Sequence, residues 1–256
     1  MRIKENCLSY WFPKIEAAGL PVPRTEILRT SVELIRLCDG ESPAGFAEFI
    51  GSLERAAEKV GYPCFLRTGQ TSGKHRWKRT CFVPDAEALP SHVASIVEFS
   101  ECCCLEGLPC DVWAVREMLP TEPAMVLPRY GDMPLCREFR CFVRDGNVEC
   151  VHGYWPTDAV LNGIGPVTEE RRADILSLAV GLCDWRPPEQ DARVRELASA
   201  AGRAIGGHWS VDVLDTKRGW MVTDMAVAED SWHWPDCPSN PKKSAVSYLP
   251  PQVPSF

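Results

Sequence analysis

Two aspartates, Asp212 and Asp224, have the arrangement of a divalent-metal site. Alternating apolar residues at positions 208–214 and 220–225 predict two strands, and the turn-like sequence DTKRG joins them into a hairpin. In that hairpin the two carboxylates face each other, with their Cβ atoms roughly 5 Å apart. Carboxylates at this distance repel each other unless a cation lies between them, and oxygen ligands suit Mg²⁺ or Mn²⁺.

The metal hypothesis depends on the register of this hairpin. If residues 216–220 form the loop, Asp215 pairs with Met221, and the ladder then brings the two aspartates opposite each other. The alternative is a register shifted by one residue, which would place one aspartate on the solvent face. Three valines in these strands favour a half-buried sheet, and therefore the metal hypothesis.

A basic, glycine-containing segment, GQTSGKHRWKR at residues 69–79, could hold phosphate. Backbone N–H groups near Gly69 and Gly73 would surround the anion, and the Lys74 ammonium would lie above it. The segment is not a P-loop, because three residues separate the glycines and His75 follows the lysine. The alternative is a solvated basic hairpin tip.

Charged residues on two further strands extend the list of candidates. Arg67 ends the apolar strand CFLR, where its charge needs an anion or solvent, and a structural salt bridge is the alternative. Glu138 and Arg140 share one face of a strand that begins the block REFRCFVRDGNVECVHGYW. Two interpretations of this pair remain open: it binds a ligand, or it only stabilises the sheet.

The rest of the chain predicts the elements that position these residues. Helical spacing of apolar residues at 46–60 is followed by a strand at 64–67, and a second helix precedes a buried strand at 111–119. Asp145-Gly146 predicts a hairpin. Further helices are expected at 15–20, 169–182 and 192–205, and an extended or disordered tail at 236–256.

Composition limits the class of protein. The 256 residues are 45% apolar, which is enough for a substantial core. A net charge of −7 argues against a protein that binds a nucleic-acid backbone by long-range attraction. The sequence has no apolar run of membrane-spanning length, and its first residues do not resemble a secretory signal. We therefore expect a soluble, unexported, cytoplasmic protein that has no membrane partner.

The thirteen cysteines agree with that location, because an odd number without an export signal indicates reduced thiols. The consecutive residues Cys102, Cys103 and Cys104 suggest zinc, but adjacent residues imitate a CxxC spacing poorly. Small buried hydrophobes are the favoured interpretation of most of the cysteines.

Taken in order, these segments resemble the ATP-grasp superfamily over residues 55–230. AAEKVGYPCFLR is similar to its helix, Gly-Tyr-Pro and strand, although the family has Lys where Arg67 stands. TSGKH resembles the loop that covers the phosphates, AVREML the hinge beside adenine, and WSVDV with WMVTDM the metal-binding strands. REFRCFVRDG resembles the family's Glu-Phe-Arg strand, which is also present in a eukaryotic ATP-grasp assembly factor for translation initiation. The opening YWFPKIEAAGLPVPRT is similar to bacterial and phage members of the arginine-rich clade.

The resemblance implies an α+β fold in which two lobes with antiparallel sheets grip a nucleotide. Residues 46–115 and 116–235 would form the two lobes, and residues 1–45 a docking segment or partial preceding domain. ATP with Mg²⁺ or Mn²⁺ would be the cofactors. Small-molecule or peptide carboxylates and amines would be the substrates, joined through an acyl phosphate by a carboxylate-amine ligase.

The resemblance also assigns roles to residues. Arg67, Lys74 and Glu138 would bind the nucleotide, together with Glu117, Met118 and Leu119 near the base and ribose. Lys74 and Arg140 would be catalytic. Asp212 and Asp224 would hold the metal.

One position departs from the superfamily's pattern. Two residues after the last metal carboxylate the superfamily commonly has Asn, and this chain has Ala226, for which Glu229 or Asp230 would have to substitute as metal ligand. The alternative function is therefore a non-catalytic ATP-binding assembly factor with a protein partner. A third interpretation, nucleic-acid modification, uses the basic stretch at 74–79 and Trp77, but the net negative charge argues against it.

Overall fold

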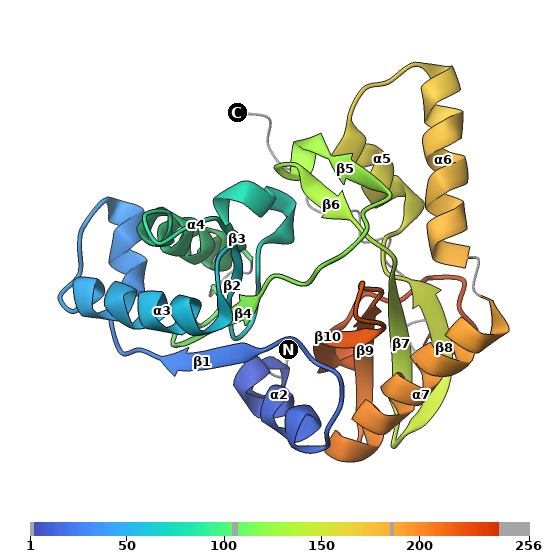
Figure 1. The fold of residues 1–256 in the computed structure, drawn as a ribbon, viewed down its shortest axis with the longest axis horizontal. Helices are drawn as coiled ribbons and strands as arrows, with labels where there is room; N and C mark the ends of the chain where they lie inside the picture. The colour runs from blue at the N-terminus through green and yellow to red at the C-terminus, as the bar shows by residue number, and fades with distance from the viewer. Residues whose placement is uncertain (1–2, 104–106, 185–186, 241–256) are drawn as a thin grey trace.

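Two four-stranded antiparallel sheets form the frame of the protein (Figure 1). In this computed structural model, which describes residues 3–103, 107–184 and 187–240, the first sheet has the strand order β1-β4-β2-β3 and the second β10-β9-β7-β8. The predicted α+β class with two antiparallel sheets is confirmed. The hairpin predicted at Asp145-Gly146 joins β7 to β8, and both residues have the positive φ angles, 48° and 83°, that a type I′ turn requires.

The first sheet belongs to the N-terminal lobe and is covered by helices on one face. Its strands are β1 (Thr25–Arg29), β2 (Cys64–Thr68), β3 (Phe82–Val83) and β4 (Val112–Glu117). Helices α3 (Phe46–Val60) and α4 (Leu89–Cys102), with the 3-10 helix η1 (Leu34–Asp39), bury their apolar sides against it. Leu66 and Val115 point into this core, so the adjacent residues Arg67 and Arg116 lie on the opposite face.

The second sheet repeats this arrangement in the C-terminal lobe. Its strands are β7 (Glu138–Arg144), β8 (Asn147–Gly153), β9 (His208–Leu214) and β10 (Met221–Val227), and helix α7 (Pro188–Ile205) packs against one face. Phe139, Cys141 and Val143 are fully buried beneath that helix. Because side chains alternate along a strand, Glu138 and Arg140 face away from α7, towards the N-terminal lobe.

The beginning of the chain contributes to both lobes. After α1 (Ile3–Asn6), helix α2 (Leu8–Ala17) places Leu8, Trp11, Phe12 and Ile15 in the core of the second sheet, and the chain then enters β1 of the first sheet. The helix predicted at 15–20 therefore has the wrong bounds, because the structure has a helix from Leu8 to Ala17 that shares only residues 15–17 with the prediction. The apolar stripe of α2 runs at helical spacing through Pro13, and its burial keeps the segment helical until a turn at Gly19.

A third group of elements lies above the second sheet in Figure 1. It contains the hairpin β5 (Met125–Leu127) and β6 (Met133–Leu135), helices α5 (Thr157–Ile164) and α6 (Glu169–Asp184), and the 3-10 helix η3 (Pro128–Tyr130). Leu127, Val160 and Trp155 are among the residues of its core. Two more 3-10 helices, η2 (Lys74–Arg79) and η4 (Ala228–Asp230), follow β2 and β10.

Two expectations concern the ends and the surroundings of the chain. The tail predicted at 236–256 lies outside the described residues from position 241 onward. Within the described ranges, the structure contains no helix that is both long enough and apolar enough to cross a membrane.

We predict that α2 is an integral part of the core of the second sheet. Ile15→Ala should reduce the free energy of unfolding by about 2–5 kcal/mol, because Ile15 is fully buried. Ile35→Ala is the matched control, since Ile35 is 46% exposed, and it should change stability by less than about 1 kcal/mol. Urea unfolding measures both, and equal effects would contradict this placement of α2.

Candidate functional site

Asp212 on β9 and Asp224 on β10 lie directly opposite each other, as the metal hypothesis requires. The register at the turn differs from the prediction, because Met221 pairs with Leu214 instead of Asp215. A bulge at Thr223 adds one residue to β10 and restores the opposition of the aspartates. Two facing carboxylates are a suitable partial ligand set for Mg²⁺, which keeps several waters and also binds substrate phosphates.

Each of the carboxylates that face the N-terminal lobe has a cationic partner. Arg140 on β7 is the cross-strand neighbour of Asp212, and its Nε and Nη2 donate to the two carboxylate oxygens at 2.8 and 2.9 Å. Burial lowers the pKa of Arg140, but the contacts with Asp212 raise it by more, so the pKa lies above its ordinary value. Arg140 therefore remains a rigid, charged, bidentate donor.

Lys74 reaches this group from the N-terminal lobe. Its Nζ lies 3.7 Å from Oε1 of Glu138 and 4.6 Å from the centre of the Tyr154 ring. Burial lowers the pKa of Lys74, but Glu138, Tyr154 and Asp212 raise it by more, so the ammonium stays charged. Glu138 is 7% exposed and also accepts a hydrogen bond from the Thr223 hydroxyl at 3.1 Å.

Arg67 joins the two lobes more tightly. Its Nη1 lies 2.9 Å from Oδ1 of Asp224, and the Arg67 side chain is only 5% exposed. Burial raises the pKa of Asp224, but Arg67, Lys74 and Arg116 lower it by more, so the pKa lies below its ordinary value. The structure therefore brings together Arg67, Lys74, Glu138, Arg140, Asp212 and Asp224, which the sequence analysis had selected from four separate segments.

Arg116 on β4 is a member of this cluster that the sequence analysis missed. It is 4% exposed, and its Nη1 donates to the backbone oxygen of Thr223 at 2.7 Å, which links the two lobes a second time. Its Nη2 is buried and has no hydrogen-bond partner among the described residues. Burial, and then the charge of Arg67, lower the pKa of Arg116 to about 9. The signal in the sequence was an arginine within the buried strand VWAVRE, where a charge needs an anion.

The segment after β2 is ordered by contacts at both of its ends. Gly73 has a φ of 62°, and its carbonyl accepts a hydrogen bond from the Thr80 hydroxyl at 2.8 Å. His75 stacks on Tyr130 of the third group of elements, with ring centres 4.5 Å apart. These contacts position Lys74 at the start of η2, so the segment is more than a solvated hairpin tip.

The remaining predicted site residues make other contacts. Glu117 accepts hydrogen bonds from the Arg24 backbone at 2.9 Å and from Arg218 at 2.7 Å, while Met118 and Leu119 follow it beyond the end of β4. Glu229 on η4 contacts His208 at 2.9 Å. His208 opens β9 four positions before Asp212, which is about 13 Å along a strand, so Glu229 does not join the two aspartates.

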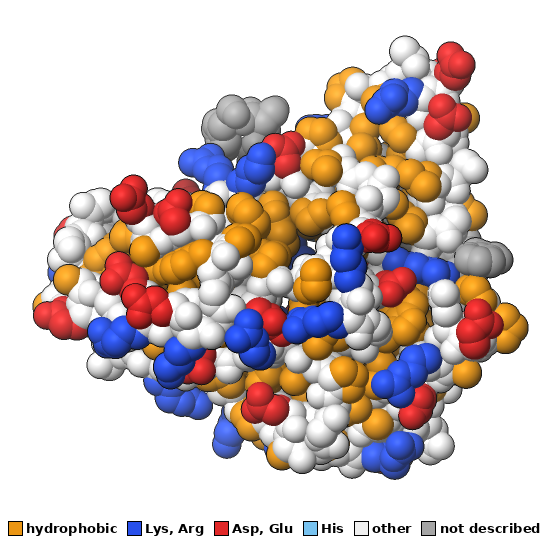
Figure 2. Space-filling view, in the orientation of Figure 1, with side chains coloured by type: hydrophobic (Ala, Val, Ile, Leu, Met, Phe, Trp, Pro, Cys, Tyr) orange, Lys and Arg blue, Asp and Glu red, His pale blue; other side chains and the backbone are white. Residues whose placement is uncertain are grey.

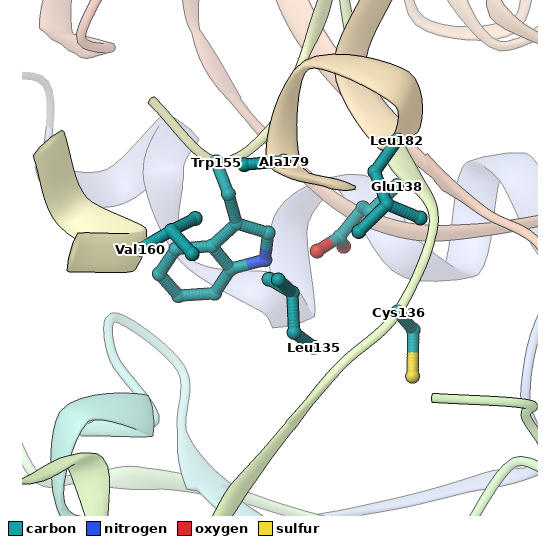
Figure 3. A pocket seen from close by; sticks show the side chains of 7 residues that line it. All are labelled: Leu135, Cys136, Glu138, Trp155, Val160, Ala179 and Leu182. Atoms are coloured by element: carbon teal, nitrogen blue, oxygen red, sulfur yellow. The ribbon is translucent and has the colours of Figure 1, made fainter. Parts of the chain in front are cut away.

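The surroundings of the cluster are both polar and apolar. Figure 2 shows basic and acidic side chains interspersed where the N-terminal lobe meets the second sheet. Glu138 also borders a small cavity, and Figure 3 shows its carboxylate turned towards Trp155. The other lining residues are Leu135, Cys136, Val160, Ala179 and Leu182.

No protein-family model and no curated protein sequence matches this chain. Solved structures do resemble it. Cdc123 from Schizosaccharomyces pombe superposes with a TM-score of 0.54 at 13% identity, covering 88% of this chain and 84% of the Cdc123 chain. A RimK domain protein ATP-grasp from Sphaerobacter thermophilus superposes with a TM-score of 0.48 at 14% identity, covering 88% of this chain and 60% of the other.

At sequence identities this low, a structural likeness shows the fold alone. The superposition on Cdc123 covers most of both chains, and the predicted ATP-grasp fold is confirmed.

We predict that the ion pair between Arg67 and Asp224 makes stability depend on pH. A carboxyl whose pKa is depressed in the folded state stabilises the protein above its unfolded pKa, and this contribution is lost as the pH falls through the folded value. Asp224→Asn should therefore reduce the free energy of unfolding near pH 7, and the deficit should shrink between about pH 5 and pH 3.

Urea unfolding across this pH range measures the deficit. Asp132→Asn is the control, because the ion pair of Asp132 with Lys78 is solvent-exposed and should contribute little at any pH. A deficit for Asp224→Asn that stays constant into acid would rule out the assigned pairing.

Proposed function

We propose that this protein binds Mg-ATP between its lobes and uses it to activate a carboxylate as an acyl phosphate, which an amine attacks to form an amide or peptide-like bond. The proposal depends on one observation: buried cationic side chains of one lobe are paired with carboxylates of the other. Arg67 and Lys74 of the first lobe are paired with Asp224 and Glu138 of the second. The same face adds Asp212 with its partner Arg140.

These pairs suit an exchange of partners when Mg-ATP binds. A triphosphate offers oxygens to Arg67, Lys74 and Arg140, and the released carboxylates can then hold a divalent ion. A buried charge that loses its partner without a replacement costs several kcal/mol. Nucleotide without metal would leave carboxylates unpaired, and metal without nucleotide would leave the cations unpaired. Binding of the two should therefore be mutually dependent.

The same groups support phosphoryl transfer. An oxygen of the substrate carboxylate attacks the γ-phosphorus, the bond to the bridging oxygen breaks, and ADP leaves. The amine then attacks the carbonyl carbon of the acyl phosphate, loses a proton, and expels phosphate. Bound Mg²⁺ would neutralise charge on the β- and γ-phosphates. Lys74 and Arg140 stay protonated, so they can stabilise the charge on the transferred group through both steps.

A non-catalytic ATP-binding assembly factor is the second candidate, and one residue favours it. Ala226 pairs with Ser210 on the strands of the aspartates, and it supplies only a methyl group where the resemblance leads us to expect an Asn ligand. The structural likeness to Cdc123, which is an assembly factor, is compatible with this role. Tight Mg-ATP binding without release of ADP, with carboxylate and amine mixtures present, would support this candidate over the ligase.

We predict that ATP binding requires the metal and both aspartates. Calorimetric titration of the wild type with ATP should show at least about tenfold tighter binding with Mg²⁺ than with EDTA, which corresponds to about 1.4 kcal/mol. Asp224→Asn should abolish this difference, and Asp132→Asn should retain it, because Asp132 pairs with the exposed Lys78 instead. Metal-independent binding by the wild type would overturn the proposed site.

We also predict different effects for two lysines of the same segment. Lys74→Ala should weaken Mg-ATP binding by about tenfold or more, because Lys74 lies in the buried cluster. Lys78→Ala should weaken it by less than about twofold, since the pair of Lys78 with Asp132 is exposed. Equal effects in the same titration would show that the cluster is not where the phosphates bind.

A further inference from the structure

Four metal-ligating side chains meet on the second sheet, outside the charge cluster. Cys150 and His152 lie on β8, and His233 and Cys237 lie in the segment that follows η4. One ligand atom of each residue lies within 4.8 Å of those of the other three. His233 and Cys237 are buried, and the other two are partly buried. Among the described residues, these four side chains form a group of His and Cys ligands that is close enough to hold one ion.

The fold explains why these residues converge. Cys150 and His152 are two positions apart on β8, so their side chains lie on the same face of the sheet. Their cross-strand neighbours on β7 are Phe142 and Arg140, respectively. The segment after η4 crosses this face, and the His233 ring stacks on Phe142 with ring centres 3.7 Å apart and planes 5° from parallel. This contact brings Nε2 of His233 to 3.3 Å from Sγ of Cys150.

Neighbouring contacts hold the other two side chains. The next aromatic residue, Trp234, stacks on His152 at 4.5 Å. A turn in which the Cys237 N–H donates to the Trp234 carbonyl at 3.1 Å returns the Cys237 thiol to the cluster. Aromatic packing and a backbone hydrogen bond therefore help to position the four side chains.

We infer that Cys150, His152, His233 and Cys237 form a structural zinc site. Two thiolates and two imidazoles are a ligand set that Zn²⁺ prefers, and the two thiolates neutralise its charge in this partly buried place. Tetrahedral zinc with ordinary bond lengths separates its ligand atoms by about 3.3–3.8 Å, so a contraction of about 1 Å in the longest separation completes the site. Four protein ligands leave no open position for substrate.

The site has a mechanical role that the surrounding elements define. β8 is one of the two edge strands of the second sheet, and the segment after η4 has no strand or longer helix within residues 231–240 to hold it. Zinc would cross-link this segment to the edge strand. The cross-link lies on the sheet face that carries Arg140, because His152 is the cross-strand neighbour of Arg140. The two proposed sites differ in their ligands. The aspartates offer oxygen, which suits Mg²⁺, and this cluster offers sulfur and nitrogen, which suit Zn²⁺.

Metal analysis of the purified full-length protein tests the inference. Mass spectrometry of the metal content should find about one zinc per chain, and Co²⁺ substitution should give the intense visible absorption of a tetrahedral thiolate site. The variant carrying Cys150→Ser and Cys237→Ser should lose both signals. The matched control, Cys38→Ser with Cys102→Ser, removes two exposed thiols and should keep both.

A ligand exchange keeps the test valid if the double variant fails to fold. His233→Cys should retain zinc and shift the Co²⁺ spectrum towards three sulfur ligands, whereas His233→Ala should reduce the zinc content. Asp224→Asn should leave the zinc content unchanged, which separates this site from the proposed ATP site. A wild-type protein without zinc and without the Co²⁺ signal, or with Cys150 and Cys237 joined in a disulfide, would overturn the inference.

Discussion

The rest of the structure depends on the need to pair buried charges between the two lobes. Arg67 with Asp224, Lys74 with Glu138, and Arg140 with Asp212 lie in a region where an unpaired charge is strongly unfavourable. Charged groups of this kind are weak contributors to stability compared with an apolar interface of the same size. Their presence at the centre of the molecule is therefore better explained by the proposed binding of a charged ligand than by a requirement of folding.

The alternation of side chains along the strands separates this polar face from the core. Each sheet buries alternate residues under helices and turns the intervening residues towards the other sheet. Phe139 and Cys141 thus stabilise the lobe, while Glu138 and Arg140 on the same strand supply charge. The bulge at Thr223 contributes to this arrangement. It places Asp212 and Asp224 directly opposite each other, although the register at the turn alone would have shifted them by one residue.

The second sheet carries two groups of side chains for which we propose metal binding, and the groups differ in their chemistry. Facing carboxylates suit a hard ion that exchanges with substrate, and the Cys and His cluster suits an ion that remains bound. Strand β8, at one edge of this sheet, would connect the two proposed sites through the pairing of His152 with Arg140. Under this interpretation, ordering of the segment after η4 and positioning of the catalytic arginine are linked through one strand.

The sequence by itself determined the local features. Helical periodicity predicted α3, two turn residues predicted the hairpin of β7 and β8, and alternation along β9 and β10 predicted that Asp212 and Asp224 share a face. Short-range spacing encodes such features, because the period of each element fixes which side chains lie on one side. The order of the motifs also predicted the ATP-grasp fold.

Only the tertiary structure decided which distant residues meet. Arg116 contacts Thr223 across 107 positions, and Cys150 contacts His233 across 83. Helix α2 packs under the second sheet although the chain next enters the first. No local periodicity contains these pairings, because they result from how two lobes bury their apolar faces and then satisfy the charges left between them.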